Sequence, residues 1–313
     1  MVVCLHDLGM NMRIIISLLF ALLMAGCSAV DIVDASEKAA LQQAGFAQHK
    51  LSLQEGGELN YWQAGQGETI LLLHGFGGTA TTSWQQVMIS LSQDYQVIAP
   101  DLAWFGESYS KGEARLSTQS QAIRQLIAAL ELDKVNLVGI SYGGFVTFDL
   151  MLSEPKVAKA VLVASPGVLF SDAELAALNQ RFDAAEASDI FVPQNPKQMR
   201  RLLDGTFVDF PWYPGFIDAE IYAKYFAGHL DEKRQLIDTL TDDRDRIAAS
   251  VAVGSLPPSM LIWGEHDKVF PLNLGIQLAD YLTAPIVVIP DGAHGLSNDY
   301  PEIVSQSVKA FVQ

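Results

Sequence analysis

The fold is decided by residues 135–144, VNLVGISYGG. The apolar run 135–138 predicts a buried strand, and residues 145–153 have a helical pattern, so Ser141 falls on the turn between them. A G-x-S-x-G string in this strand-turn-helix context is typical of a serine nucleophile held on a sharp turn. The flanking glycines permit the turn, and the start of the following helix favours developing negative charge. Ser141 is therefore the predicted nucleophile. The alternative, a glycine-rich turn with a capping serine, fits this context less well.

Strand and helix patterns alternate on both sides of this stretch. Together they predict a mostly parallel central sheet with helices on both faces, an α/β fold in which loops at the carboxyl ends of the strands carry the function. A helix is expected between about residues 118 and 130. The other predicted strands are 51–53 and 59–62, joined by a glycine turn, then 69–73, 95–99, 160–164, 259–263 and 286–289.

The alternation stops between residues 168 and 254, where the sequence is mostly helical in pattern and charged. We expect a helical cap or lid insertion over the strand ends, with the core formed by 49–167 and 255–313. The insertion carries an aromatic patch, and two interpretations of it stay open. Either these side chains face an apolar substrate, or they pack the insertion's own small core. The patch consists of Phe207, Phe210, Trp212, Tyr213 and Phe216.

The position of the general base follows by elimination. Of six histidines, His294 is the one that follows the last predicted strand and precedes the final helical segment, the place of the base in the chain order serine, acid, histidine. An imidazole there can accept the Ser141 proton and return it to a leaving group. The other five histidines lie elsewhere in the chain. His6 lies near the N-terminus, His49 before the first strand and His74 after strand 69–73, while His229 lies in the insertion and His266 beside a carboxylate.

The acid that orients His294 is expected after strand 259–263. Glu265 and Asp267 both lie there. Asp267 is preferred because it lies deeper in the loop, where a short carboxylate can meet the imidazole N–H. Glu265 remains the alternative.

The glycine-rich loop after strand 69–73, His74-Gly75-Phe76-Gly77-Gly78, is expected to supply one donor of an oxyanion hole. The residue after the nucleophile supplies the other, so the backbone N–H groups of Phe76 and Tyr142 are the predicted donors. His74 is interpreted as a structural residue that hydrogen bonds within its own loop.

Composition narrows the partners. Half of the 313 residues are hydrophobic, which allows a large core, and the formal net charge is -16. That charge argues against nucleic acid as a partner and against electrostatic attachment to an anionic membrane. No H-E-x-x-H, Walker or cysteine-ligand pattern is present, so we expect neither a metal nor a cofactor.

The N-terminus has the pattern of an export signal. Residues 14–25 are apolar and follow Arg13, and Met24-Ala25-Gly26-Cys27-Ser28 resembles the lipobox of bacterial lipoproteins. This resemblance implies a signal peptide over 1–26 and lipidation of Cys27. Residues 27–48, mostly polar and alanine-rich, are expected to form a tether or a short helix. Serine after the cysteine implies an exported, lipid-anchored protein of the outer membrane. An ordinary secretory signal is the alternative.

Several of these motifs together resemble the α/β-hydrolase superfamily over nearly all of 49–313. They are 74–77, 100–102, 105–108, 139–144, 264–267 and 292–294. Residues 165–167 and 190–201 are similar to monoacylglycerol lipases of the α/β-hydrolase-domain type and to lipases of the Moraxella and Psychrobacter kind. One position departs from the family pattern: Trp104 replaces a glycine in the loop 100–106, near the expected pocket mouth.

The resemblance implies a carboxylic ester hydrolase, acting on acylglycerols or medium-chain esters through an acyl-enzyme on Ser141. Other activities on the same fold stay open: C–C bond hydrolysis, proline iminopeptidase and perhydrolase. Dehalogenases and epoxide hydrolases are disfavoured because they place Asp at the Ser141 position. A non-catalytic binding protein with this fold is a further alternative, although no member of the predicted triad has been lost.

Overall fold

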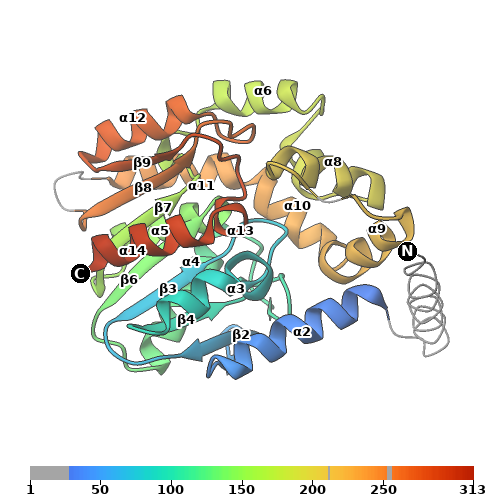
Figure 1. Ribbon diagram of the computed structural model, residues 1–313. Coiled ribbons are helices and arrows are strands. Elements are labelled where there is room, and N and C mark those ends of the chain that lie inside the picture. The colour runs from blue at the N-terminus through green and yellow to red at the C-terminus, as the bar shows by residue number, and fades with distance from the viewer. Residues whose placement is uncertain (1–27, 211, 252–255) are drawn as a thin grey trace, which may run out of the picture.

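The computed structural model describes residues 28–210, 212–251 and 256–313. The predicted signal peptide and Cys27 lie outside the described residues. A single sheet with helices on both faces forms the body of the protein (Figure 1), which confirms the predicted fold class. Within the described residues, no helix combines the length and the apolar character needed to cross a membrane.

The sheet has the strand order β1-β2-β4-β3-β6-β7-β8-β9. From β4 to β9 neighbouring strands are parallel, whereas β2 runs antiparallel to both β1 and β4. A short strand that the sequence pattern did not indicate, β5, pairs with β2. The strands are β1 (Ala47–Ser52), β2 (Gly57–Ala64), β3 (Thr69–Leu73), β4 (Gln96–Pro100), β5 (Tyr109–Ser110), β6 (Val135–Ile140), β7 (Val157–Val163), β8 (Ser259–Gly264) and β9 (Ile286–Ile289).

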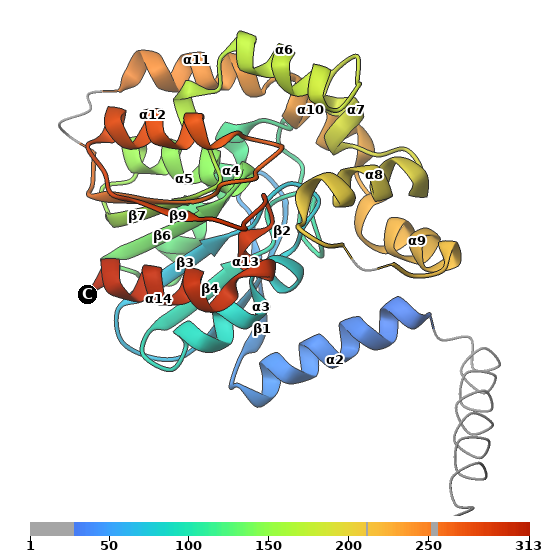
Figure 2. The same ribbon diagram turned by 45° about the horizontal axis from the view of Figure 1, so that its top comes forward.

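Two groups of helices cover the sheet, and Figure 2 shows one group above it and one below. Above lie α4 (Leu116–Ala129), α5 (Tyr142–Ser153) and α12 (Leu272–Leu282). Below lie α2 (Ala29–Gln43), α3 (Ala80–Leu91) and α14 (Pro301–Val312). The central strands β3 and β6 are buried along their whole length because both faces are covered. Their side chains divide between two apolar cores, with Leu71 and Leu137 in one and Ile70 and Val138 in the other.

Between β7 and β8 the chain forms a run of helices, which we call the cap and define as residues 172–250. Figures 1 and 2 show α8, α9 and α10 gathered at one end of the molecule. The cap helices are α6 (Asp172–Arg181), α7 (Ala187–Phe191), α8 (Pro196–Thr206), α9 (Gly215–Ile221), the π-helical turn η2 (Tyr222–Phe226), α10 (Leu230–Asp238) and α11 (Leu240–Ser250). A short 3-10 turn, η1 (Gly167–Leu169), leads into it.

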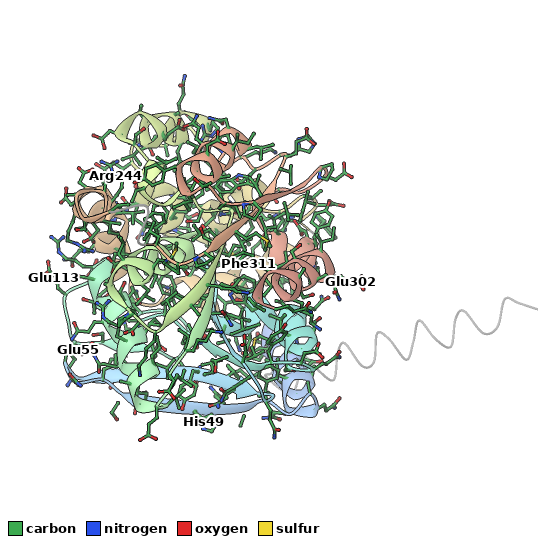
Figure 3. The ribbon with its side chains drawn as sticks, turned by 90° about the vertical axis from the view of Figure 1, so that its left-hand side faces the viewer. His49, Glu55, Glu113, Arg244, Glu302 and Phe311 are labelled. Atoms are coloured by element: carbon green, nitrogen blue, oxygen red, sulfur yellow. The ribbon has the colours of Figure 1, made fainter. Side chains whose placement is uncertain are left out.

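Arg244 holds α11 to the start of the cap. Its guanidinium donates to the carbonyl of Phe170 at 2.6 Å and to the carboxylate of Asp172 at 3.1 Å, and its side chain is largely buried (Figure 3). The two ends of the cap therefore meet where the cap leaves and rejoins the sheet.

Candidate active site

Ser141 occupies the turn between β6 and α5 in a strained backbone conformation, with φ 53° and ψ -118°. A non-glycine residue rarely adopts a positive φ, and such strain is common at functional sites. The turn fits because its neighbours lack side chains. A Cβ on Gly143 would lie 2.3 Å from the carbonyl oxygen of Leu73, and one on Gly75 would lie 3.2 Å from the Ser141 Cβ. The glycines thus let the turn pack directly against the loop after β3.

Two loops bring His294 and Asp267 to this serine. The His294 Nε2 lies 2.8 Å from Ser141 Oγ, and its Nδ1 lies 2.8 Å from Asp267 Oδ2. All three side chains are buried. His294 lies between β9 and the short helix α13 (Leu296–Asp299), and Asp267 lies between β8 and α12. The three residues that the sequence selected therefore form one hydrogen-bonded row.

The remaining contacts of Asp267 settle the direction of these hydrogen bonds. Its Oδ1 accepts from the backbone N–H groups of Val269 and Phe270, both at 2.8 Å, so hydrogen bonds hold both carboxylate oxygens. A carboxylate can only accept, so His294 donates from Nδ1 and leaves Nε2 to accept the Ser141 hydroxyl proton. The ring of Phe270 packs edge-on against His294 at 5.5 Å and limits its movement.

The alternative residues lie elsewhere. Glu265 and His266 are both exposed to solvent. His49 lies at the edge of the sheet, stacked on Tyr61 at 5.2 Å (Figure 3), and His229 is exposed at the start of α10. The geometry therefore brings Asp267, and not Glu265, to His294.

His74 is fully buried between the loops that follow β3 and β4. Its Nε2 accepts from the backbone N–H of Leu102 at 2.8 Å, so its Nδ1 carries the proton and donates to the carbonyl of Gly75 at 2.8 Å. Burial lowers the pKa of His74, which keeps the ring neutral. The bond to Gly75 lies within the His74 loop, as predicted, whereas the bond to Leu102 reaches a second loop that the sequence did not indicate. The ring joins the loops after β3 and β4.

Phe76 and Tyr142 lie side by side next to the serine. Their rings meet edge to face at 5.5 Å. Among the hydrogen bonds of the described residues, neither backbone N–H has an acceptor. Tyr142 is also the first residue of α5, where the N–H groups are directed away from the helix. Within the described residues, both N–H groups are therefore free of a protein acceptor.

The cap covers this site at two points. The ring of Phe76 packs within an apolar cluster formed by cap residues, including Phe191 at 6.2 Å. On the other side, the carbonyl of Thr206 at the end of α8 accepts hydrogen bonds from the backbone N–H groups of His294 and Gly295. The sequence pattern indicated neither contact, because both join segments far apart in the chain.

Trp104 and four residues of the aromatic patch, Phe207, Phe210, Trp212 and Tyr213, were expected to line the substrate pocket, and they do not share one environment. Phe207 lies against the His294 loop, since a Cβ on Gly295 would lie 2.5 Å from its ring. Phe210 stacks on Phe207 at 5.3 Å, and Tyr213 meets Phe210 edge-on at 5.8 Å. These three extend outward from the active site.

The two tryptophans are placed differently. Trp212 is 83% exposed and faces solvent. Trp104 is fully buried in the core, with its indole N–H donating to the carbonyl of Ser110 at 3.1 Å. Trp104 has a φ of 69°, a left-handed backbone conformation that glycine adopts easily. The backbone at this position therefore still suits the glycine of the family pattern, although this chain has tryptophan. The described contacts link neither tryptophan to Ser141 or His294 directly.

The sequence did not single out Lys233, although it lies close to these loops. Its side chain is buried in α10, with the amine 5.1 Å from the centre of the Phe105 ring, which itself packs against Phe76 and His74. Burial lowers the pKa of Lys233 to about 8, partly opposed by the nearby charge of Glu232. Only burial in the folded chain distinguishes it from the other lysines.

Among the described residues, no group of three or more His, Cys, Asp or Glu side chains is arranged to hold a metal ion.

Comparisons with known proteins agree with this architecture. The chain is 28% identical over 240 residues to 2-hydroxymuconate semialdehyde hydrolase of Pseudomonas sp. The aligned region covers 71% of this chain and 78% of that protein. The chain is 22% identical over 313 residues to Lipase 1 of Psychrobacter immobilis, which covers 96% of each chain. Among solved structures, a bacterial membrane phospholipase A is similar, with a TM-score of 0.76, 22% identity and 98% of each chain covered.

A family model described as the alpha/beta hydrolase family matches residues 70–306. That range includes the Ser141 turn, the cap, and the loops that carry Asp267 and His294. The chain belongs to the alpha/beta hydrolase family.

Proposed function

We propose that this protein is a carboxylic ester hydrolase in which Ser141, His294 and Asp267 form the catalytic triad. The observation that carries the proposal is the row of hydrogen bonds from Asp267 Oδ2 through the imidazole to Ser141 Oγ, with 2.8 Å at each step. A serine so placed, at the start of a helix and beside two free backbone N–H groups, has what acyl transfer requires.

In the first step Ser141 Oγ attacks the ester carbonyl carbon while His294 Nε2 takes the hydroxyl proton. The carbonyl oxygen gains negative charge, which the N–H groups of Phe76 and Tyr142 bind. The protonated imidazole, stabilised by Asp267, then gives its proton to the leaving alcohol. Water attacks the acyl-enzyme with His294 again as base, and release of the acid restores Ser141.

The surroundings of the row favour an apolar acyl group. Phe270 packs against His294, and Phe76 and Phe191 pack together above the other side of the site. Phe207 is proposed as a pocket wall because it lies against the His294 loop. Acylglycerols and medium-chain esters present such acyl groups, and similarity to a lipase over 96% of both chains supports this substrate class.

A second candidate is hydrolysis of a C–C bond. It is favoured by the 28% identity to 2-hydroxymuconate semialdehyde hydrolase, which is higher than the identity to the lipase. The same triad can serve either reaction, so the identity of the substrate has to separate them.

An ester series from p-nitrophenyl acetate to palmitate, together with a monoacylglycerol, tests the proposal. We expect turnover with a maximum at medium chain length, and its loss in Ser141→Ala. Ester turnover at the wild-type rate by Ser141→Ala would exclude this nucleophile. A wild type that ignores every ester but cleaves a vinylogous diketone would establish the second candidate.

We also propose that the protein is exported and lipid-anchored at Cys27 in the outer membrane. The support is the lipobox-like 24–28 and the apolar run 14–25. Metabolic labelling with palmitate should mark the wild type but not Cys27→Ser. Equal labelling of the two would exclude this anchor.

A further inference from the structure

Exposed apolar side chains gather on the cap and on the helix that precedes the sheet. Trp212 is 83% and Phe216 60% exposed, and Val208 is exposed nearby in the sequence. Ile32 and Val33, on α2, are also exposed. Figures 1 and 2 both show the start of α2 at the same end of the molecule as α8 and α9. Large exposed apolar side chains in one region indicate an interaction surface.

Basic residues lie beside this apolar surface. Arg200 and Arg201 follow Lys197 by three and four positions on α8, so both lie on the same side of the helix as Lys197. They line an open pocket of about 490 Å³ together with Asp204 and Asp218. A local group of cations is unusual in a chain of net charge -16. The net charge of the whole chain disfavours binding to an anionic membrane. At the cap, however, the cations on α8 favour such binding.

The three cations are not equivalent. Arg200 pairs with Asp204 at 3.0 Å and lies over the rings of Phe210 and Tyr213, so it holds the aromatic segment in place. Lys197 and Arg201 are exposed, and no carboxylate of the described residues lies within 4.0 Å of either. These two side chains are therefore free to bind an anion outside the protein.

The N-terminal chain reaches the molecule at the same place. The hydroxyl of Ser28 donates to Glu220 on α9 at 2.9 Å, and the backbone N–H of Val30 donates to the same carboxylate at 3.2 Å. Lys224 of η2 pairs with Asp31 and Asp34 of α2. Ser28, the first described residue, therefore lies beside α9, the helix that carries Phe216.

We propose that Lys197, Arg201, Trp212 and Phe216 form a docking face for a bilayer that contains anionic phospholipid headgroups. Lys197 and Arg201 bind headgroup phosphates, while Trp212 and Phe216 enter the interface, where amphipathic and apolar rings are favourable. The proposal rests on the proposed function only for the lipid anchor, which would hold this face at the membrane. Because α8 ends at Thr206, which bonds to the His294 loop, docking brings the active site next to its ester substrates.

The test measures binding of the full chain to sedimented vesicles of phosphatidylcholine, with and without one quarter phosphatidylglycerol. All proteins carry Cys27→Ser and Ser141→Ala, so covalent lipid is absent and the vesicle lipids stay intact. Failure of the esterase or anchor proposal therefore leaves this result unaffected. Residues 1–27 are identical in every variant, so they do not affect the comparison of one variant with another.

We expect the reference protein to bind the anionic vesicles about tenfold more tightly at low salt, and Lys197→Glu with Arg201→Glu to abolish that preference. The control, Lys111→Glu with Lys134→Glu, makes the same charge change at exposed lysines and should keep it. Trp212→Ala with Phe216→Ala should weaken binding to both vesicles. Equal binding of the reference protein to both vesicles, or an unchanged preference in the Lys197 and Arg201 variant, would overturn the proposal. Matching thermal unfolding midpoints show that each variant is folded.

Discussion

The carbonyl oxygen of Thr206 accepts hydrogen bonds from the backbone N–H groups of His294 at 3.0 Å and of Gly295 at 2.9 Å. Thr206 is the last residue of α8, so the end of a cap helix holds the loop that carries the proposed base. The next residue, Phe207, packs against the same loop. The cap therefore both covers the active site and fixes the position of one of its residues.

This contact predicts that Gly295→Ala lowers activity. The new Cβ would lie 2.5 Å from the Phe207 ring, so either the ring or the His294 loop must move. We expect kcat/KM for esters to fall about tenfold, because small displacements of a catalytic group are costly. Phe207→Ala removes the clash, so Gly295→Ala should cost little activity when it is added to Phe207→Ala. Steady-state kinetics of the two single variants and the double variant measure the coupling. Additive losses would show that the ring and the loop act independently.

The choice of acid predicts opposite results for two neighbouring carboxylates. Asp267→Asn should reduce kcat by about 10⁴-fold, because an amide can stabilise the wrong imidazole tautomer. Glu265→Gln, the matched control in the same loop, should retain wild-type kcat, since Glu265 is exposed. The p-nitrophenyl butyrate assay measures both. The reverse result would make Glu265 the acid.

The buried Lys233 predicts a pH-dependent stability difference. Burial lowers the pKa of its amine to about 8, from 10.5 in the unfolded chain. Below pH 8 both states bind the proton and the burial penalty is present in full. Between pH 8 and 10.5 the unfolded state binds more protons, so its contribution to the free energy of unfolding rises with pH. Lys233→Met lacks the penalty at every pH.

Urea unfolding at several pH values measures this difference. The stability of Lys233→Met relative to wild type should fall by roughly 2 kcal/mol between pH 7 and 9.5. Lys134→Met, at an exposed lysine, is the control and should show no such trend. A constant difference for Lys233→Met would mean that the amine is not desolvated.

The left-handed backbone at Trp104 predicts that the glycine variant is more stable than the alanine variant, the reverse of the usual order. Removing the buried indole should destabilise both Trp104→Ala and Trp104→Gly, by roughly 3 kcal/mol. Glycine should be the more stable of the two by about 1 kcal/mol, because it adopts a φ of 69° without strain. At Trp84, buried within helix α3, the ordinary order should hold and alanine should be favoured. Urea unfolding checks both pairs, and alanine favoured at both sites would contradict the strain at Trp104.

The sequence determined much of this protein because its decisive signals are local. A buried strand, a glycine turn and a helix lie within twenty residues around Ser141, and the chain order of the strands predicts where each following loop lies. The run 69–73 predicted a strand with the observed bounds, since a strand covered on both faces must be apolar throughout. The run 286–289 also predicted the observed bounds, although β9 is the last strand of the sheet and is partly exposed. The family and the fold followed from these segments.

Other features depend on residues that meet only after folding. Glu265 and Asp267 stand two positions apart in one loop, and only the path of that loop buries one beside His294 and exposes the other. Trp212 and Trp104 are both aromatic residues near expected pocket segments, yet one faces solvent and the other fills the core. Composition cannot separate them, because burial depends on what packs against each side chain.

The Ser141 turn, then, was determined by the sequence, since its shape is set by the conformational freedom of adjacent glycines. The acid that completes the row, the bond from Thr206 to the His294 loop, and the cations free on α8 were decided by the tertiary structure. Each of these depends on a distance between segments separated by many residues, and no local pattern encodes such a distance.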